Sequence, residues 1–279
     1  MSLKRSFILC VVLCGLLKID PILAEEKPLW EMGVGVAALY LPDYRGSDEG
    51  RFYALPYPYL IYRGDILRVD RDRISGRIFA TDRLLLDVSF YGSLPVDSDD
   101  NNARRGMPDL DPTFEVGPAL NLMLLKDDRD RYKLSMTLPV RAVFSTDFSN
   151  LRREGWVFAP RLNLEVKDII SDSGVNLGLS AGPLFADRDY HDYFYTVKPR
   201  YATPWRSAYA SSSGYSGLTV TLGLDKTLKS LIIHAFISAD FMEGATIKDS
   251  PLVTKNHSIM GGVTISWVFF KSAKMVTIK

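Results

Sequence analysis

Residues 132–144 read Tyr-Lys-Leu-Ser-Met-Thr-Leu-Pro-Val-Arg-Ala-Val-Phe, and every second side chain from Tyr132 to Phe144 is apolar. A period of two is typical of a β-strand whose two faces meet different surroundings. At roughly 3.3 Å per residue the segment spans ~40 Å, which is about twice the usual length of a strand in a soluble protein. A tilted strand that crosses a bilayer needs ~9–11 residues with one face apolar throughout. The stretch therefore predicts a membrane-crossing strand, and such a strand needs partners of the same kind.

The same alternation recurs along the chain. The further segments are 30–41, 51–62, 83–93, 113–124, 155–166, 175–186, 215–226, 231–241 and 257–269. Between Gly64 and Ala80 the pattern is weaker, because the polar pair Asp72-Arg73 separates two short apolar stretches. A hairpin there gives twelve strands, whereas a single strand gives an odd number and places the ends of the barrel on opposite sides of the membrane. We predict an all-β fold, a transmembrane antiparallel β-barrel of about twelve strands, with ten as the nearest alternative.

The connections between these segments alternate in length. Short turns are expected at 63–65, 81–82, 125–131, 167–174 and 227–230, and long polar loops at 42–50, 94–112, 146–154, 187–214 and 242–256. Short turns on one side and long loops on the other are typical of outer-membrane barrels. A soluble β-sandwich distributes its loop lengths more evenly. The loop pattern therefore favours the membrane barrel.

Prolines interrupt several of the predicted strands. They are Pro56, Pro58, Pro118, Pro139, Pro160 and Pro183. Proline cannot donate a hydrogen bond to a strand ladder, and a closed barrel has no edge on which to place it. We therefore expect bulges or local breaks in the barrel at these positions.

The N-terminus indicates export. Lys4 and Arg5 precede an apolar run from Phe7 to Leu17, and Ala24 offers a small residue for cleavage. We predict a cleaved signal peptide over 1–24, followed by one barrel domain over 25–279. Both cysteines lie in the signal, so the mature chain can hold no disulfide and no thiolate metal site.

Net charge and hydropathy narrow the class further. Without the signal, 31 basic residues (34 − 3) face 32 acidic ones (33 − 1), which takes the net charge from +1 to −1. A near-neutral chain without basic blocks gives no reason to expect nucleic-acid binding. No later segment is apolar for the ~18 consecutive residues that a transmembrane helix needs. A mean hydropathy near zero also fits a barrel whose strands have one apolar and one polar face.

Several segments resemble the MipA/OmpV family of Gram-negative outer-membrane proteins. The similarity covers nearly the whole mature chain and rests on these blocks: Gly33-Val34-Gly35, Leu41-Pro42-Asp43-Tyr44-Arg45-Gly46-Ser47-Asp48, Leu55-Pro56-Tyr57-Pro58-Tyr59, Tyr62-Arg63-Gly64, Arg105-Gly106-Met107-Pro108-Asp109-Leu110-Asp111, Glu115-Val116-Gly117-Pro118, Tyr190-His191-Asp192-Tyr193-Phe194-Tyr195-Thr196-Val197, Tyr201 and Ser213-Gly214-Tyr215. The resemblance implies a barrel in the cell outer membrane without catalytic activity.

The resemblance also implies partners. The family's best-described role is a scaffold that joins a murein-synthesising penicillin-binding protein to a lytic transglycosylase. Other members look like porins or adhesins, so a porin-like channel or a surface adhesin is the alternative function. We further expect a monomer surrounded by outer-membrane lipid and lipopolysaccharide. One departure is that the aromatic pair Phe269-Phe270 is followed by a C-terminal tail, 271–279, which we expect to extend into the periplasm.

Ionisable residues fall on the face of the strands that is predicted to line the lumen. They are Glu31, Asp87, Glu115, Lys133, Arg141, Arg161, Glu165, His234 and Asp240. They fit either a charged pore that selects ions or solutes, or a lumen filled with paired side chains. Wide aqueous channels appear at ~16–18 strands, so the filled lumen is favoured at about twelve.

No group of residues predicts catalysis, a cofactor or a bound metal. The histidines His191, His234 and His257 accompany no nucleophile motif, which argues against a hydrolase. The acidic run 97–102 offers oxygen ligands to Ca²⁺, but it lacks the glycine and glutamate of an EF-hand loop, so a solvated loop is favoured. We therefore predict a non-enzymatic protein with no catalytic, cofactor-binding or metal-binding residues.

The 187–214 loop is rich in aromatic residues and arginine. Such residues suit recognition of a partner or a sugar, with Trp205 and Arg206 as examples. They also suit a loop that folds inward and packs on itself as a lid. The sequence leaves both interpretations open.

Overall fold

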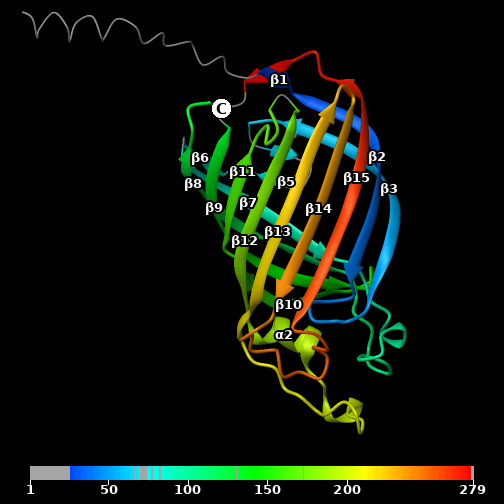
Figure 1. The fold of residues 1–279 in the computed structure, drawn as a ribbon. Coiled ribbons are helices and arrows are strands. Elements are labelled where there is room, and N and C mark those ends of the chain that lie inside the picture. The colour runs from blue at the N-terminus through cyan, green and yellow to red at the C-terminus, as the bar shows by residue number, and fades with distance from the viewer. Residues whose placement is uncertain are drawn as a thin grey trace, which may run out of the picture.

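The stretch around Tyr132 forms β9 (Tyr132–Thr146), which pairs with β8 on one side and with β10 and β11 on the other. The computed structural model describes residues 26–65, 67–69, 74–76, 78–81, 83–129, 131–171 and 173–277. The predicted signal peptide lies outside these residues. All strand pairs in the described part are antiparallel, and their strands tilt around a common axis to form a barrel (Figure 1).

The barrel strands follow the sequence in order. They are β2 (Trp30–Pro42), β3 (Gly50–Arg63), β4 (Leu67–Val69), β5 (Ile74–Gly76), β6 (Phe79–Ala80), β7 (Leu84–Ser93), β8 (Thr113–Lys126), β9, β10 (Leu151–Phe158), β11 (Arg161–Val166), β12 (Val175–Ala186), β13 (Gly214–Leu228), β14 (Leu231–Phe241) and β15 (His257–Lys271). A separate two-stranded sheet joins β1 (Glu26–Pro28) to β16 (Met275–Thr277). The helices are α2 (Arg188–Tyr195) and two 3₁₀ turns, Ser98–Asp100 and Pro199–Tyr201.

These strands occupy twelve positions in the described sheet. β10 and β11 both lie between β9 and β12 and keep one register on each side, so they are a single strand broken at Ala159-Pro160. β5 pairs with β4, and β6 pairs with β7. We count β5 and β6 together as the one position between β4 and β7. β5 also lies beside β7, which brings the two ends of the sheet together. The prediction of an antiparallel barrel with about twelve strands is confirmed.

The wall has an apolar outer face. Val34, Val36 and Ile265 project outward and are exposed, as are many large apolar side chains at equivalent positions. Between them, inward positions carry buried polar groups such as Ser238 and Ser266. An outward band of apolar side chains is what a bilayer requires of a transmembrane strand. The alternation in the sequence therefore indicates which side chains face the bilayer and which face the lumen.

Only some of the prolines interrupt a strand ladder, whereas we predicted a bulge or break at each of them. Pro160 breaks its strand, and the β8–β9 ladder has no partners recorded across Gly117-Pro118, as expected. The β2–β3 ladder, in contrast, runs through Pro56 and Pro58 without a shift of register. On the side away from β2, β3 is paired to β4 only at its last two residues in the described chain. The two prolines are tolerated because this part of β3 behaves as an edge, which proline accepts.

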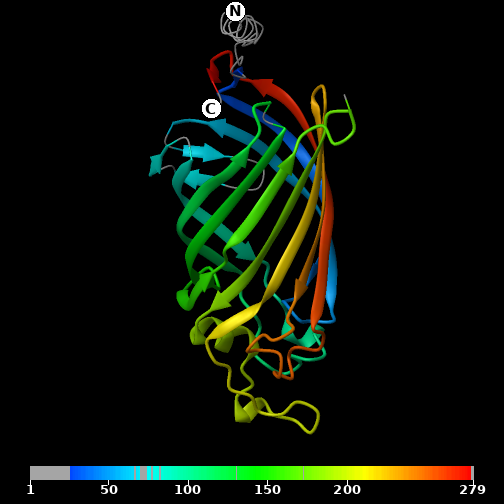
Figure 2. The same ribbon diagram turned by 60° about the vertical axis from the view of Figure 1, so that its left-hand side comes forward.

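The two ends of the barrel differ. Figures 1 and 2 show α2 and the long connections at the lower end, and the short turns, β1 and the C-terminus at the upper end. An arm of the 187–213 connection, coloured yellow, reaches furthest below the barrel. The short-turn end of an outer-membrane barrel faces the periplasm, and the long loops face outward.

Candidate functional site

The barrel mouth at the long-loop end is covered by a cap made of four connections, 43–49, 94–112, 187–213 and 242–256. Its largest fully buried apolar side chains include Met242, Ile247 and Leu252, none of which is exposed. Hydrogen bonds tie the connections together: the Tyr44 hydroxyl donates to the Leu252 carbonyl at 2.9 Å, and the Tyr195 hydroxyl donates to the Arg45 carbonyl at 3.1 Å. The cap is therefore a packed layer with its own apolar core.

Helix α2 lies at the centre of this cap. Asp187 caps its N-terminus by accepting a hydrogen bond from the Tyr190 amide at 3.0 Å. Tyr190 and His191, and one turn later Phe194 and Tyr195, are its buried residues. The helix thus directs one face into the barrel mouth. For the first part of the 187–214 loop, the interpretation as a packed lid is correct.

The second part of that loop is an arm, 198–208, most of whose residues are exposed. Trp205, near its tip, is 81% exposed. Arg206 anchors the arm by donating to the carbonyls of Tyr201, Ala103 and Arg105. The loop therefore combines both predicted roles, because the arm presents an aromatic side chain beyond the packed cap.

His191 sits inside the cap as a neutral ring. Its Nδ1 faces the Ser212 carbonyl at 2.5 Å, which can only accept, so Nδ1 carries the proton and Nε2 accepts from the Ser216 hydroxyl at 2.6 Å. Burial lowers the pKa of His191 below its usual value, although the Ser212 carbonyl opposes this shift. The buried ring therefore favours the uncharged state in the folded cap.

The cap is expected to loosen in acid. Because the pKa of His191 is lower when folded than when unfolded, the unfolded loop binds more protons as the pH falls below about 6.5, and the cap loses stability there. Limited proteolysis at a series of pH values should show faster cleavage within 187–213 below this point. In a His191→Gln variant, the connection should be cleaved at a rate that does not depend on pH between about 5 and 7. An unchanged pH dependence in that variant would assign the effect to another group.

Below the cap, the lumen holds two buried ion pairs. Arg141 Nε donates to Glu115 Oε2 at 2.7 Å, and Arg45 Nη2 lies 3.1 Å from Asp240 Oδ1. Glu115 is only 5% exposed, and Asp240 also accepts a hydrogen bond from Thr219. The prediction that Glu115, Arg141 and Asp240 face the lumen agrees with these contacts. Arg45 was missed because it comes from a loop, and no strand pattern marks a loop residue as lumen-facing.

Most of the other predicted lumen residues lie apart from this cluster. Glu31 pairs with Arg63 at 2.6 Å near the short-turn end, where Lys271 also approaches it. His234 Nδ1 lies 2.9 Å from Asp225, and Asp87 accepts from Asn121. Lys133 and Glu165 are directly opposite each other on β9 and β11. The last of the nine, Arg161, starts β11 and interacts electrostatically with Glu115 and Arg141, so it belongs with the cluster below the cap. The structure thus distributes the charges along the lumen and brings them into no single catalytic group.

The acidic run 97–102 is used within the cap. Asp97 caps the 3₁₀ turn, Asp100 pairs with Arg51, and the Asn101 side chain donates to Asp43. Among the described residues, no group of three or more histidine, cysteine, aspartate or glutamate side chains is placed to hold a metal ion. The run thus joins 94–112 to its neighbours: the Asn101 amide donates to the 43–49 connection, and the Asp100 carboxylate pairs with Arg51 at the start of β3.

The first and last described strands meet at the short-turn end of the barrel. β1 and β16 pair in register, with Lys27 opposite Val276, and the Leu29 amide donates to the Lys274 carbonyl at 2.8 Å. Arg63 joins this sheet to the barrel by donating to the Pro28 carbonyl. The tail 271–279, which we predicted to extend into the periplasm, is partly folded in its described part, since Lys271 ends β15 and 275–277 form β16; 278–279 lie outside the described residues.

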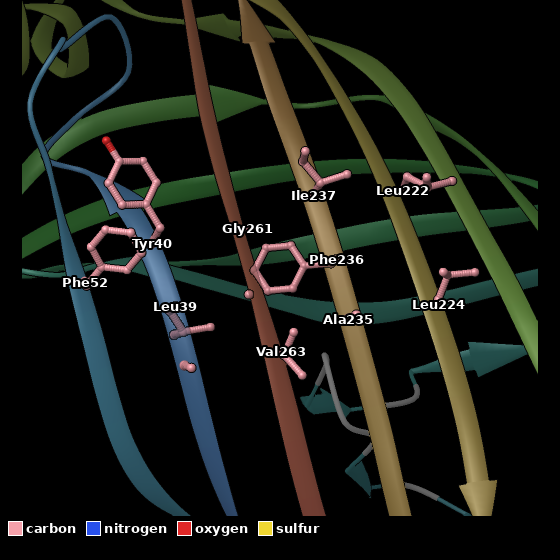
Figure 3. Close-up of a pocket in the computed structure, with 12 residues that line it drawn as sticks. Leu39, Tyr40, Phe52, Leu222, Leu224, Ala235, Phe236, Ile237, Gly261 and Val263 are labelled. Carbon is pink, nitrogen blue, oxygen red and sulfur yellow. The ribbon is translucent and has the colours of Figure 1, made fainter.

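A shallow groove of about 400 Å³ lies on the outer wall (Figure 3). Its floor has small residues, Ala38, Ala235 and Gly261, from three neighbouring strands. Tyr40 and Phe52 border it at one end, and Leu222 and Leu224 at the other. The lining is apolar throughout, so in a bilayer this groove faces acyl chains.

The described residues contain no helix long and apolar enough to cross a membrane. Comparison with known proteins gives one family: the sequence profile described as "MltA-interacting protein MipA" matches residues 34–269. No curated protein matches the sequence significantly.

Several solved structures have a similar course of the chain. The translocator domain of the autotransporter NalP from Neisseria meningitidis is 13% identical, with 95% of each chain covered and a TM-score of 0.44. A bacterial polysaccharide outer membrane secretin is 8% identical, covering 88% of this chain and 99% of that one, with a TM-score of 0.43. The Pseudomonas putida toluene transporter TodX is 9% identical, covering 88% and 68%, with a TM-score of 0.31. Similarity of this degree carries no information about function.

Proposed function

Because the chain belongs to the family of the MltA-interacting protein MipA, we propose that this outer-membrane β-barrel protein is a scaffold for murein enzymes. Its partners on the periplasmic side would be a lytic transglycosylase and, with it, a murein synthase. The family name supports the first partner, and the family's general role supports the second. No catalytic step is assigned to the barrel itself.

The observation that carries this proposal is the folded sheet at the periplasmic end. In the described part of the chain β16 pairs with β1 alone, so its outer edge has no neighbouring strand. An unpaired strand edge can accept an extended segment of another protein through backbone hydrogen bonds. Lys274, immediately before β16, is exposed and would favour an acidic partner segment. The sheet thus offers a docking edge on the side where murein lies.

The expected result is loss of the partner when this edge is removed. Val276→Pro removes an amide donor from the β1–β16 ladder and, like deletion of 272–279, should reduce co-purification of the lytic transglycosylase by about tenfold or more. Deletion of 199–208 at the opposite end should leave it unchanged. The heat-dependent shift in electrophoretic mobility of a folded barrel verifies assembly of each variant. Full co-purification by both tail variants would contradict the proposal.

The alternative, a porin-like channel, has less support. The described loops pack into a cap over the mouth, and the charged groups beneath it are largely paired. A channel requires a continuous water-filled path. Planar-bilayer recording distinguishes the two functions, because stable single-channel steps from the wild-type protein would favour the channel.

A further inference from the structure

At the long-loop end, the β9–β10 hairpin carries two adjacent arginines that face opposite sides of the wall. Arg153 lies directly opposite Phe144, and Arg152 lies directly opposite Ser145. Ser145 is fully buried on the lumen side, whereas Phe144 belongs to the same row of β9 as the exposed Val140. Because residues paired across a ladder share one face of the sheet, Arg152 points toward the lumen and Arg153 points toward the bilayer.

The two arginines also differ in their partners. Arg152 forms an ion pair with Asp111 and a longer one, at 3.7 Å, with Glu154. Among the described residues, the Arg153 guanidinium makes no hydrogen bond or ion pair, and its one specific interaction is with the ring of Trp156, whose centroid lies 5.2 Å away. Attraction to a ring orients a guanidinium but does not replace its hydrogen bonds. The N–H donors of Arg153 therefore remain available for an oxygen ligand.

Apolar side chains flank Arg153 along the same face of β10. Trp156 and Phe158, toward the membrane centre, are 44% and 37% exposed, and Leu151, on the loop side, is 60% exposed. Beyond Leu151, Phe148 in the turn is 90% exposed and has a φ of 65°, which a bulky residue rarely adopts. The apolar surface thus continues past Arg153 toward the outside, so its guanidinium lies at the edge of the bilayer. An arginine in that zone is stabilised by anionic lipid headgroups.

We propose that Arg153, oriented by Trp156, binds a phosphate group of lipid A, the phosphorylated glycolipid anchor of lipopolysaccharide, and so holds one such lipid against β9 and β10. The long-loop end of an outer-membrane barrel meets the outer leaflet, which contains this lipid. A guanidinium binds phosphate through two parallel hydrogen bonds, and the outward Phe144 and Phe158 suit the acyl chains. A soluble acidic protein fits less well, because Arg153 faces lipid. The site is independent of the periplasmic edge, so its failure leaves the scaffold proposal untouched.

The test is native mass spectrometry of the folded protein titrated with lipid A in a mild detergent. Wild-type protein should bind lipid A about tenfold more tightly than lipid A from which the phosphates have been removed. Arg153→Gln should weaken binding of lipid A by about tenfold, because a charge-assisted pair of hydrogen bonds is lost. Arg153→Lys keeps the charge but not the bidentate geometry, so its affinity should fall between those of wild type and Arg153→Gln.

Arg152→Gln is the matched control, because it removes the neighbouring arginine on the opposite face, and it should bind lipid A like wild type. The heat-dependent shift in electrophoretic mobility verifies that each variant is folded. Equal affinity of wild type and Arg153→Gln would overturn the site, and so would an equal loss in both arginine variants or equal binding of the phosphate-free lipid. Inorganic phosphate should compete weakly, because it lacks acyl chains. Full competition by inorganic phosphate would overturn the lipid ligand in favour of a soluble anion.

Discussion

Replacing Gly182 with alanine is expected to destabilise the barrel by about 3 kcal/mol, at the upper end of the usual cost of overpacking. A Cβ atom built on Gly182 would lie 1.9 Å from the carbonyl oxygen of Pro160 on the neighbouring strand. Backbone cannot move aside as a flexible side chain can. The break at Ala159-Pro160 places this carbonyl against β12, and Gly182 leaves room for it because glycine has no Cβ atom.

The matched control lies on the same strand and the same face. Gly178 is four residues away on β12, and a Cβ there meets nothing within 4 Å. Gly178→Ala should therefore change stability by less than about 0.5 kcal/mol. The measurement is the denaturant midpoint of the heat-modifiable band for the two variants in the same detergent. Equal midpoints would show that the Pro160 carbonyl moves without cost.

The long strands were predictable because alternation is imposed by the membrane on every one of them. β9 begins at Tyr132 as predicted and ends at Thr146, one residue beyond the predicted strand 132–145, and β12 and β14 have the predicted bounds. The hairpin predicted between Gly64 and Ala80 is only partly described, as the strands β4, β5 and β6 of two or three residues each. Stretches of that length contain too few residues to show a period. β1 and β16 were missed for the same reason.

The cap was less predictable, although one signal was present. Asp187 as an N-cap, followed by aromatic residues at positions 190 and 194, has the spacing of an amphipathic helix. That spacing identifies α2, but it does not reveal that the helix lies in the barrel mouth. The pairing of Arg45 with Asp240 joins a loop to a strand almost two hundred residues away, and only the folded cap brings them together.

Replacing Tyr195 with alanine is expected to open the cap without unfolding the barrel. The Tyr195 side chain is 2% exposed, and its hydroxyl donates to the Arg45 carbonyl, which holds the 43–49 connection against α2. Removing a buried aromatic ring of this size costs about 3–5 kcal/mol. The barrel keeps its ladders, so the loss falls on the cap alone. Trypsin should then cleave the 187–213 connection at least about tenfold faster than in wild type.

Trp205→Ala is the control variant, because it removes an exposed aromatic side chain where Tyr195→Ala removes a buried one. Trp205 belongs to the same connection but projects from the arm and packs on little, so its removal should leave the cleavage rate and the denaturant midpoint unchanged. Tyr195→Phe keeps the ring and loses only the hydrogen bond, and should cost about 1 kcal/mol. If Tyr195→Ala lowers the denaturant midpoint of the barrel in addition to accelerating cleavage of the connection, then cap and barrel unfold as one unit. The cap would then be an integral part of the barrel, and loosening it in acid through His191 would weaken the whole protein.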